Sequence, residues 1–296
     1  MRTHAYTLAG LRVESDFAIP ELPRPRGKAA ADVRIRLGRV PNRLRGALAH
    51  PMFEATPTAY LLRGAPMARY LVRDGREVTV APARGADMRA VRVFLLGPCL
   101  RALCHQRGLV PLRASAVEVA GEAIALAGPS MAGKSTIAAR LGRAGFPVLA
   151  DDVCIVGFDA ADRPIVLPSV PRLRVWRDAL RRLGEEPKGP PDRSGIPRYS
   201  IAIPPVLAPR PLARIYLLDR QPLPKARGQR LPTLLAARAL AILSSVRALT
   251  EPMGRDTHHF SLVLKLLAAG VEVHSFPRGT DCGKDAAKLA RMFARR

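Results

Sequence analysis

The first part of the chain carries short apolar segments, several of which alternate apolar and polar positions as the strands of a half-buried sheet do. The clearest example is Val33–Leu37, in which arginines separate the apolar residues. Asp74 and Gly75 form a typical hairpin turn between two of these segments. We therefore predict a small β-rich N-terminal domain over residues 1–86, without a catalytic cluster. Its expected strands are 6–8, 11–13, 33–37, 59–62, 68–72 and 78–80.

Between residues 87 and 107 the apolar residues change to helical spacing. Gly97 and Pro98 lie in the middle of this segment and should kink the helix there. We expect residues 87–110 to form a helix that bridges two halves of the chain. The apolar residues that recur on one face are Val91, Leu95, Leu96, Leu100 and Leu103.

From residue 111 to 296, strand-like and helix-like segments follow one another, which predicts an α/β fold with α+β character and a mixed sheet. A strand is expected at 112–119, an apolar run follows at 123–127, and a helix is expected at 135–144. A second apolar run at 146–150 is interpreted as a parallel neighbour of the first. Further strands are expected at 153–158, 164–167, 199–203, 213–218 and 271–276, and further helices at 177–183, 232–246, 258–268 and 284–293.

A phosphate-binding pattern separates the two apolar runs. Gly128 to Ser135 read Gly-Pro-Ser-Met-Ala-Gly-Lys-Ser, which fits Gly, four residues, Gly, Lys and Ser or Thr. The glycines allow the backbone to close round a phosphate, and the N–H groups of the loop and of the next helix point at it. Lys134 would reach the β- and γ-phosphates, and the Ser135 hydroxyl would bind Mg²⁺. The residues expected to bind the nucleotide are Gly128, Ser130, Ala132, Gly133, Lys134, Ser135 and Thr136.

Two adjacent carboxylates, Asp151 and Asp152, end the second apolar run. Ligands of open α/β sheets bind at the carboxyl ends of strands, so both side chains should lie near the phosphate loop. One carboxylate can hold the metal ion, and the other can accept a proton from an attacking hydroxyl. The sequence therefore predicts a site for a nucleotide with Mg²⁺.

The composition adds a strongly basic charge balance. The chain has 296 residues, 48% of them hydrophobic, with a formal net charge of +24 and a pI of about 11.4. A basic surface favours anionic partners such as nucleotides, acidic peptides, nucleic acids or anionic membranes. The arginines are spread along the chain without an aromatic stripe, so we interpret most of them as solvated and rank nucleic-acid binding last.

The cysteines and the lack of long apolar runs indicate in which cellular compartment the protein is found. None of the four cysteines forms a C-x-x-C pair, and the six histidines show no metal-binding spacing. The sequence shows no secretory signal and no run long enough to span a bilayer. We therefore predict a cytoplasmic protein with reduced thiols and no membrane partner.

The phosphate loop, the short helix and Val148-Leu-Ala-Asp-Asp together resemble the kinase core of HPr kinase/phosphorylase, over about residues 110–220. Three other segments resemble the smaller HPr-kinase-like proteins found with lasso-peptide and other modified-peptide systems. This second resemblance extends over nearly the whole chain. The segments that carry it are residues 8–22, 171–176 and 211–218.

The resemblance implies an ATP-dependent kinase that phosphorylates a serine hydroxyl. In the lasso-peptide subgroup that serine is the C-terminal residue of a precursor peptide. The resemblance also implies that Asp151 is the general base and that Asp152 binds Mg²⁺. Lys134 and Ser135 inherit the roles that the phosphate loop assigns to them.

Three features depart from the family pattern. Met131 stands where HPr kinase has glycine, which makes the loop less open. Arg113 stands where the family usually has a histidine that assists the aspartate, and an arginine there could keep Asp151 ionised or hold a phosphate. The chain has no counterpart of the Arg-Gly-Leu-Gly-Ile stretch linked to phosphorylase activity, so we predict kinase activity without efficient reverse phosphorolysis.

Four arginines are candidates for binding substrate or phosphate, namely Arg113, Arg172, Arg174 and Arg198. Arg172 and Arg174 share one face of a strand and could clamp an ATP phosphate or a peptide carboxylate, or could simply be solvated. A small-molecule acceptor, nucleotidyl transfer and a non-catalytic nucleotide-binding protein remain open alternatives. A homo-oligomer is also open, because the helical segment 232–268 could form a subunit contact or belong to the core.

Overall fold

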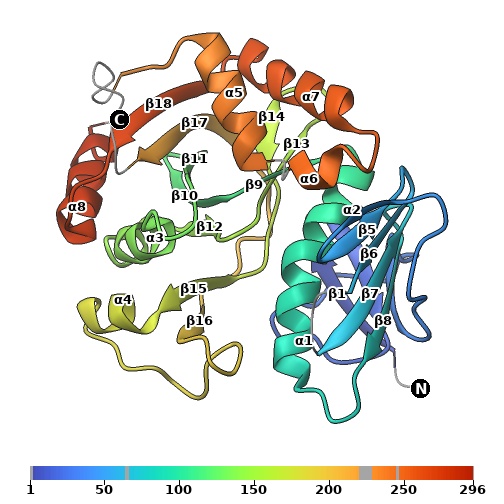
Figure 1. The fold of residues 1–296 in the computed structure, drawn as a ribbon. Coiled ribbons are helices and arrows are strands. Elements are labelled where there is room, and N and C mark those ends of the chain that lie inside the picture. Colours follow the sequence, from blue (N-terminus) through green and yellow to red (C-terminus); the bar gives the residue numbers. More distant parts are fainter. Residues whose placement is uncertain (1–2, 64–66, 220–228, 245–246, 296) are drawn as a thin grey trace.

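The structure is a computed structural model that describes residues 3–63, 67–219, 229–244 and 247–295. Its N-terminal part is a mixed sheet with the strand order β1-β2-β3-β8-β7-β6-β5-β4 (Figure 1). Every strand predicted for this part is present. Two further strands, β4 and β5, were not predicted, because they have only three residues each and are too short to show a two-residue period. The strands are β1 (His4–Leu8), β2 (Leu11–Ser15), β3 (Val33–Leu37), β4 (Leu48–His50), β5 (Phe53–Ala55), β6 (Ala59–Leu62), β7 (Ala68–Arg73) and β8 (Glu77–Pro82).

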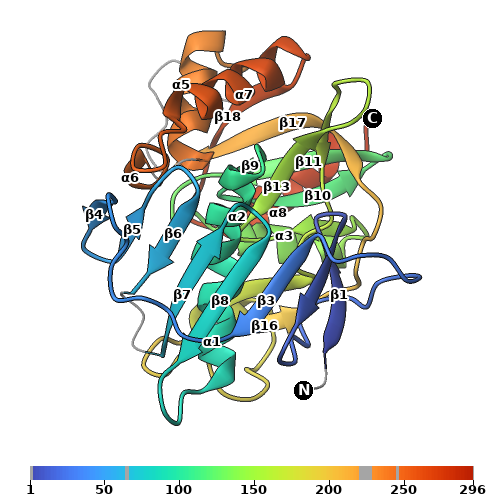
Figure 2. The ribbon, with the colours of Figure 1, turned by 90° about the vertical axis from the view of Figure 1, so that its right-hand side faces the viewer.

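A long helical segment covers one face of this sheet. It consists of α1 (Met88–Phe94), the π-helical turn η1 (Leu95–Cys99) and α2 (Leu100–Gln106). Pro98 lies inside η1, where its missing N–H and its ring favour a wider turn over a regular α-helix. The Gly-Pro pair thus lies in a local change of helical pitch, and the kink expected there stays a prediction. Figure 2 shows the sheet from its outer side, with α1 and α2 behind it.

The second sheet has the order β12-β10-β11-β17-β14-β13-β9, and β18 pairs with β17. β11, β17 and β18 run parallel to one another, and the remaining pairs are antiparallel. The predicted fold class, α/β with a mixed sheet, is thus confirmed. The strands are β9 (Val110–Leu112), β10 (Ala114–Val119), β11 (Glu122–Ala127), β12 (Val148–Ala150), β13 (Cys154–Phe158), β14 (Pro164–Val166), β17 (Arg210–Asp219) and β18 (Glu272–Pro277).

The second apolar run, now β12, is not the parallel neighbour of the first, so that prediction is wrong. β10 lies between β11 and β12 and pairs antiparallel with both. The tight turn at Ala120 and Gly121, with φ values of 49° and 82°, returns the chain directly beside β10. Because β10 opposes both strands, β11 and β12 still run in one direction. Their carboxyl ends, followed by Gly128 and Asp151, therefore lie at one edge of the sheet.

Helices cover both faces of the second sheet (Figure 1). One face packs against α3, α8 and a separate hairpin of β15 and β16, and the other packs against α5 and α7. None of the described helices has both the length and the apolar character needed to cross a bilayer. The elements are α3 (Lys134–Arg143), β15 (Arg172–Trp176), α4 (Arg177–Arg182), β16 (Arg198–Ala202), α5 (Thr233–Ser244), α6 (Arg247–Thr250), α7 (Asp256–Ala268) and α8 (Cys282–Phe293).

One hydrophobic cluster extends across the two sheets. The cluster under the N-terminal sheet also contains Ile155 of β13, and Leu249 and Met253 near α6. The backbone adds a contact, because the Ala9 N–H donates to the Pro168 carbonyl at 2.7 Å. The two parts therefore share buried apolar surface, and the domain boundaries given above stay a prediction.

Apolar side chains are exposed on α5 and α7. The most exposed, Leu234, retains 77% of its accessible surface. This surface does not test the homo-oligomer, which stays an open alternative. The other exposed side chains are Leu235, Ile242, Phe260 and Leu264.

Two buried histidines connect α2 with α7. The ring centroids of His105 and His259 lie 4.9 Å apart, and His259 Nε2 lies 2.7 Å from Ser244 Oγ. Burial lowers the pKa of His105 to about 3, and the pKa of His259 to about 4. Both imidazoles are therefore neutral in the folded protein near neutral pH, while the unfolded chain would titrate near pH 6.5.

We expect the protein to lose stability in mild acid because of this pair. Between pH 6.5 and the folded-state pKa values, the unfolded state binds a proton at each histidine that the folded state does not bind. The free energy of unfolding should therefore be intact above pH 6.5 and should fall by about 1 kcal/mol per pH unit and histidine below it. Urea unfolding of His105→Gln and His259→Gln at pH 7 and pH 5 measures this. An unchanged pH slope in both variants would contradict it.

Candidate active site

The phosphate loop lies between β11 and α3, and neither of its two glycines has room for a side chain. Gly133 has a φ of +85° and caps α3, and a Cβ there would lie 2.9 Å from Cys282 Sγ. A Cβ on Gly128 would lie 2.9 Å from the Leu218 carbonyl oxygen. Met131 also has a positive φ of 64°, which explains in physical terms why glycine suits this position. The Met131 side chain is 65% exposed and points away from the core.

Lys134 folds back over the loop. Its Nζ donates to the carbonyl oxygens of Gly128 at 3.0 Å and Pro129 at 2.7 Å. Burial lowers the pKa of this ammonium to about 8, against the raising effect of Asp151. An anionic phosphate in the loop would give the lysine a stronger partner than two neutral carbonyls.

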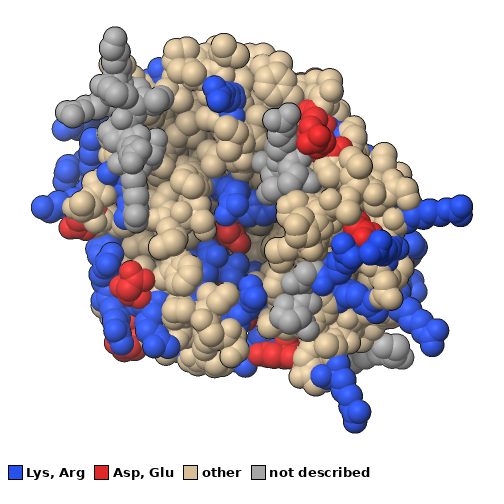
Figure 3. Space-filling model, in the orientation of Figure 1, with Lys and Arg blue, Asp and Glu red and all other residues tan. Residues whose placement is uncertain are grey.

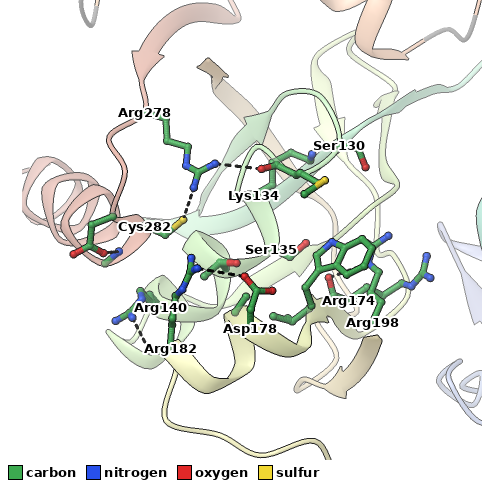
Figure 4. A pocket seen from close by; sticks show the side chains of 18 of the residues that line it. Ser130, Lys134, Ser135, Arg140, Arg174, Asp178, Arg182, Arg198, Arg278 and Cys282 are labelled. Atoms are coloured by element: carbon green, nitrogen blue, oxygen red, sulfur yellow. Dashed lines mark hydrogen bonds and ion pairs between the residues drawn. The ribbon is translucent and has the colours of Figure 1, made fainter. Parts of the chain in front are cut away.

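A cavity of about 770 Å³ opens above the loop (Figure 4). Figure 4 shows Lys134 and Ser135 on the loop, Arg174 and Arg198 on the side of the β15–β16 hairpin, and Arg278 toward α8. Two loop residues, Gly128 and Ala132, do not line the cavity, and the Ala132 side chain is buried in the core. The residues of the phosphate loop that do line it are Ser130, Met131, Gly133, Lys134, Ser135 and, in the first turn of α3, Thr136.

Asp151 lies below the loop with both carboxylate oxygens occupied. Oδ1 accepts hydrogen bonds from Ser115 Oγ at 2.6 Å and from Ser135 Oγ at 2.8 Å. Oδ2 accepts a hydrogen bond from the backbone N–H of Arg174 at 2.8 Å. Burial raises the pKa of Asp151, although these hydrogen bonds partly oppose the effect. The structure thus joins the predicted metal ligand Ser135 and the predicted base through one hydrogen bond.

Asp152 faces the cavity and lies among arginines. It has a φ of 67°, in the left-handed region that turns it away from its neighbour. Its carboxylate lies 3.1 Å from Arg174 Nη1, 3.7 Å from Arg101 Nη2 and 3.9 Å from Arg198 Nη2. Burial by itself raises the pKa of Asp152, but the arginines outweigh burial and lower it to about 2. The adjacent carboxylates therefore differ in the pH range over which each can take up a proton.

The four candidate arginines do not all lie together. Arg113, Arg174 and Arg198 line the cavity. Arg172 does not: it is buried, and its guanidinium lies 4.0 Å from Glu21 of the N-terminal part. Strand alternation placed Arg172 and Arg174 on one face, but their long side chains turn to different carboxylates.

Arg113 lies at a break that the sequence did not indicate. The segment predicted as one strand, 112–119, is two strands, β9 and β10, which pair with different partners. Arg113 stands between them, and its backbone N–H donates to the Leu243 carbonyl at 2.9 Å. The chain changes direction there, which lets the side chain reach the cavity.

Sequence reasoning missed several cavity residues. Arg278 follows β18 and donates to the Met131 carbonyl oxygen at 3.2 Å and to Cys282 Sγ at 3.2 Å. The available signal was an arginine just after a predicted strand, at the same carboxyl edge as the loop. Arg101, on α2, does not line this cavity, but its Nη2 donates to the Asp152 carbonyl oxygen at 2.7 Å, and no local pattern pointed to it. Figure 3 shows Lys and Arg side chains, with some acidic ones, around a hollow in the middle of this face.

No family model matches the chain, and no curated protein is significantly similar to it in sequence. Among solved structures, the Hpr(Ser) kinase/phosphatase from Coxiella burnetii is similar with a TM-score of 0.36 and 14% identity, over 62% of this chain and 95% of that one. An overlap at that TM-score is too distant to assign a function, so the chemistry has to come from the residues themselves.

Proposed function

We propose that the protein is a Mg²⁺- and ATP-dependent kinase that transfers the γ-phosphate to a serine hydroxyl of a peptide, the C-terminal serine of a lasso-type precursor. One observation carries the proposal. The phosphate loop and Asp152 line one cavity, and Asp151, buried beside it, accepts a hydrogen bond from Ser135 of the loop. A phosphate site with an adjacent buried carboxylate is the arrangement that phosphoryl transfer needs.

The residues present fit ATP and Mg²⁺. Ser135 and the two aspartates offer only oxygen donors, which Mg²⁺ prefers. Arg278 lines the cavity, and its Nε is buried without a hydrogen-bond partner among the described residues, so it can take an anionic group. The loop N–H groups and Lys134 would hold the β- and γ-phosphates. Bound Mg²⁺ would neutralise charge on the transferred phosphoryl group.

The two aspartates divide the remaining work. The raised pKa of Asp151 makes it the better proton acceptor, since a base with a pKa nearer the working pH is more effective. The serine oxygen bonds to the γ-phosphorus, its proton passes to Asp151, and the bond from the γ-phosphorus to the bridging oxygen breaks to release ADP. Asp152, ionised and facing the cavity, would hold the metal ion. The arginines around it would stabilise negative charge on the phosphoryl group during transfer.

The test is the intact mass of a synthetic peptide that ends in serine, after incubation with this protein and Mg·ATP. We expect the mass to rise by one phosphate, and we expect no increase with the Asp151→Asn variant. A mass increase of one nucleoside monophosphate would keep the site and replace the reaction with nucleotidyl transfer. Nucleotide binding without any product on peptides or small hydroxyl compounds would contradict the kinase and favour a sensor.

A further inference from the structure

A second cavity, of about 450 Å³, adjoins the nucleotide cavity. It lies between the N-terminal sheet, η1 and the β15–β16 hairpin. The two cavities share five lining residues, so the second one begins where the first one ends. The shared residues are Arg113, Asp152, Arg174, Trp176 and Arg198.

The wall of the second cavity that belongs to the N-terminal part is apolar and aromatic. Phe53 stacks with His50 at 4.5 Å and packs against Tyr60 at 5.2 Å between ring centroids. Met52, beside them, is 44% exposed. Such a wall can bury an apolar side chain of a ligand. The other apolar lining residues are Leu62, Val93, Phe94, Pro98 and, from outside the N-terminal part, Ile196 and Leu249.

The lining of the second cavity also carries an excess of positive charge. Five arginines and two aspartates line the cavity, so the positive side chains outnumber the negative ones by three. Arg174 is paired with Asp152 at 3.1 Å and with Asp192 at 2.9 Å. The Arg113 guanidinium, by contrast, has no hydrogen-bond or ion-pair partner within the described part of the chain. It is therefore available for an anionic group of a ligand.

The segment between α4 and β16 closes one side. Arg193, in that segment, places its Cζ 4.7 Å from the centre of the Phe94 ring on α1. Its Nε is buried without a partner among the described residues. The segment thus reaches from the core to the N-terminal part and adds a second cation beside the apolar wall.

We propose that this second cavity binds the acceptor, namely the last residues of a peptide chain. The hydroxyl to be phosphorylated lies at the shared boundary near Asp152. The carboxylate of the terminal residue pairs with Arg113, and an apolar side chain of the preceding residue packs on Phe53, Tyr60 and Met52. The inference rests on the proposed function and adds a specificity to it: a free carboxyl terminus with an apolar residue just before the serine.

The test uses binding to the protein saturated with Mg·ADP, so that it does not depend on turnover. The probes are three hexapeptides that differ at their ends: Leu-Ser with a free carboxylate, Leu-Ser amide, and Asp-Ser with a free carboxylate. Trp176 is the only tryptophan and lines both cavities, so its fluorescence reports either ligand. We expect the first probe to bind about tenfold more tightly than each of the others.

Two variants test whether the peptide binds against the apolar wall. Met52→Glu puts a charge on the apolar wall, and Met292→Glu puts one on α8, where Met292 is 39% exposed and outside both cavities. We expect Met52→Glu to weaken the first probe about tenfold and to leave Mg·ADP binding unchanged, while Met292→Glu changes neither. Arg113→Ala should remove the preference for the free carboxylate over the amide.

Each contrary result is distinct. Equal binding of the first probe to Met52→Glu and Met292→Glu, or no peptide binding by the protein with Mg·ADP, would overturn the acceptor site while leaving the kinase proposal to the mass measurement. Weaker Mg·ADP binding by Met52→Glu would assign the second cavity to the nucleotide base instead. Failure of the unaltered protein to bind Mg·ADP would overturn the proposed function itself.

Discussion

Replacement of Asp151 by asparagine is expected to lower the rate of phosphate transfer by about a thousandfold, within the range that a general base contributes. The amide can still accept a hydrogen bond from Ser135, but it cannot take up a proton from the attacking hydroxyl. Mg·ADP should still bind, because Lys134 and the loop N–H groups are unchanged. Single-turnover transfer, together with Mg·ADP titration by calorimetry, separates the two effects.

The dependence of this rate on pH gives a second readout. A carboxylate must be ionised to act as a base, so activity should be lost as the pH falls through the pKa of Asp151. Burial raises that pKa, and the loss should therefore begin at a higher pH than for an ordinary aspartate. The residual activity of Asp151→Asn should lack this step.

Asp152→Asn is the matched control, since it changes the neighbouring carboxylate. The pKa of Asp152 is about 2, so its removal should not move a step in the pH profile. It should instead raise the concentration of Mg²⁺ needed for half-maximal rate. If Asp152→Asn removed the pH-dependent step and Asp151→Asn changed only the Mg²⁺ requirement, the two roles would have to be exchanged.

The backbone at the site could be predicted because local patterns determine it. The glycines and Lys134 of the loop follow from the fixed spacing of the phosphate-binding pattern. Asp151 and Asp152 follow from their place after an apolar run. The strands of the N-terminal sheet follow from alternation, except for the three-residue β4 and β5. In each case the residues that carry the signal are close in sequence.

What could not be predicted depends on contacts between distant segments. The place of β12 depends on β10, which the turn at Ala120 and Gly121 inserts beside β11. The low pKa of Asp152 depends first on Arg101, which α2 brings to it from fifty-one positions away. The second cavity is lined by both Phe53 and Arg113, which come from distant segments of the chain. No periodicity within one segment contains such information.

Replacement of Lys134 by methionine is expected to lower the transfer rate by about a thousandfold and to weaken Mg·ADP binding as well. The lysine is the only lysine that lines the cavity among the described residues, and methionine keeps much of its length without the charge. Lys265→Met is the control. Lys265 lies on α7 beyond the opposite face of the sheet, in an exposed ion pair with Asp162, and such pairs contribute little to stability.

The pH dependence of binding identifies the lysine directly. Burial lowers the pKa of Lys134 to about 8. The side chain is therefore charged at pH values well below 8 and loses its proton and its charge as the pH rises above 8. Phosphate binding favours the charged form, and the affinity for Mg·ADP should therefore decrease as the pH rises through 8 and beyond. The slope should be absent in Lys134→Met and retained in Lys265→Met. An equal slope in all three proteins would mean that a group other than Lys134 causes the pH dependence of nucleotide binding.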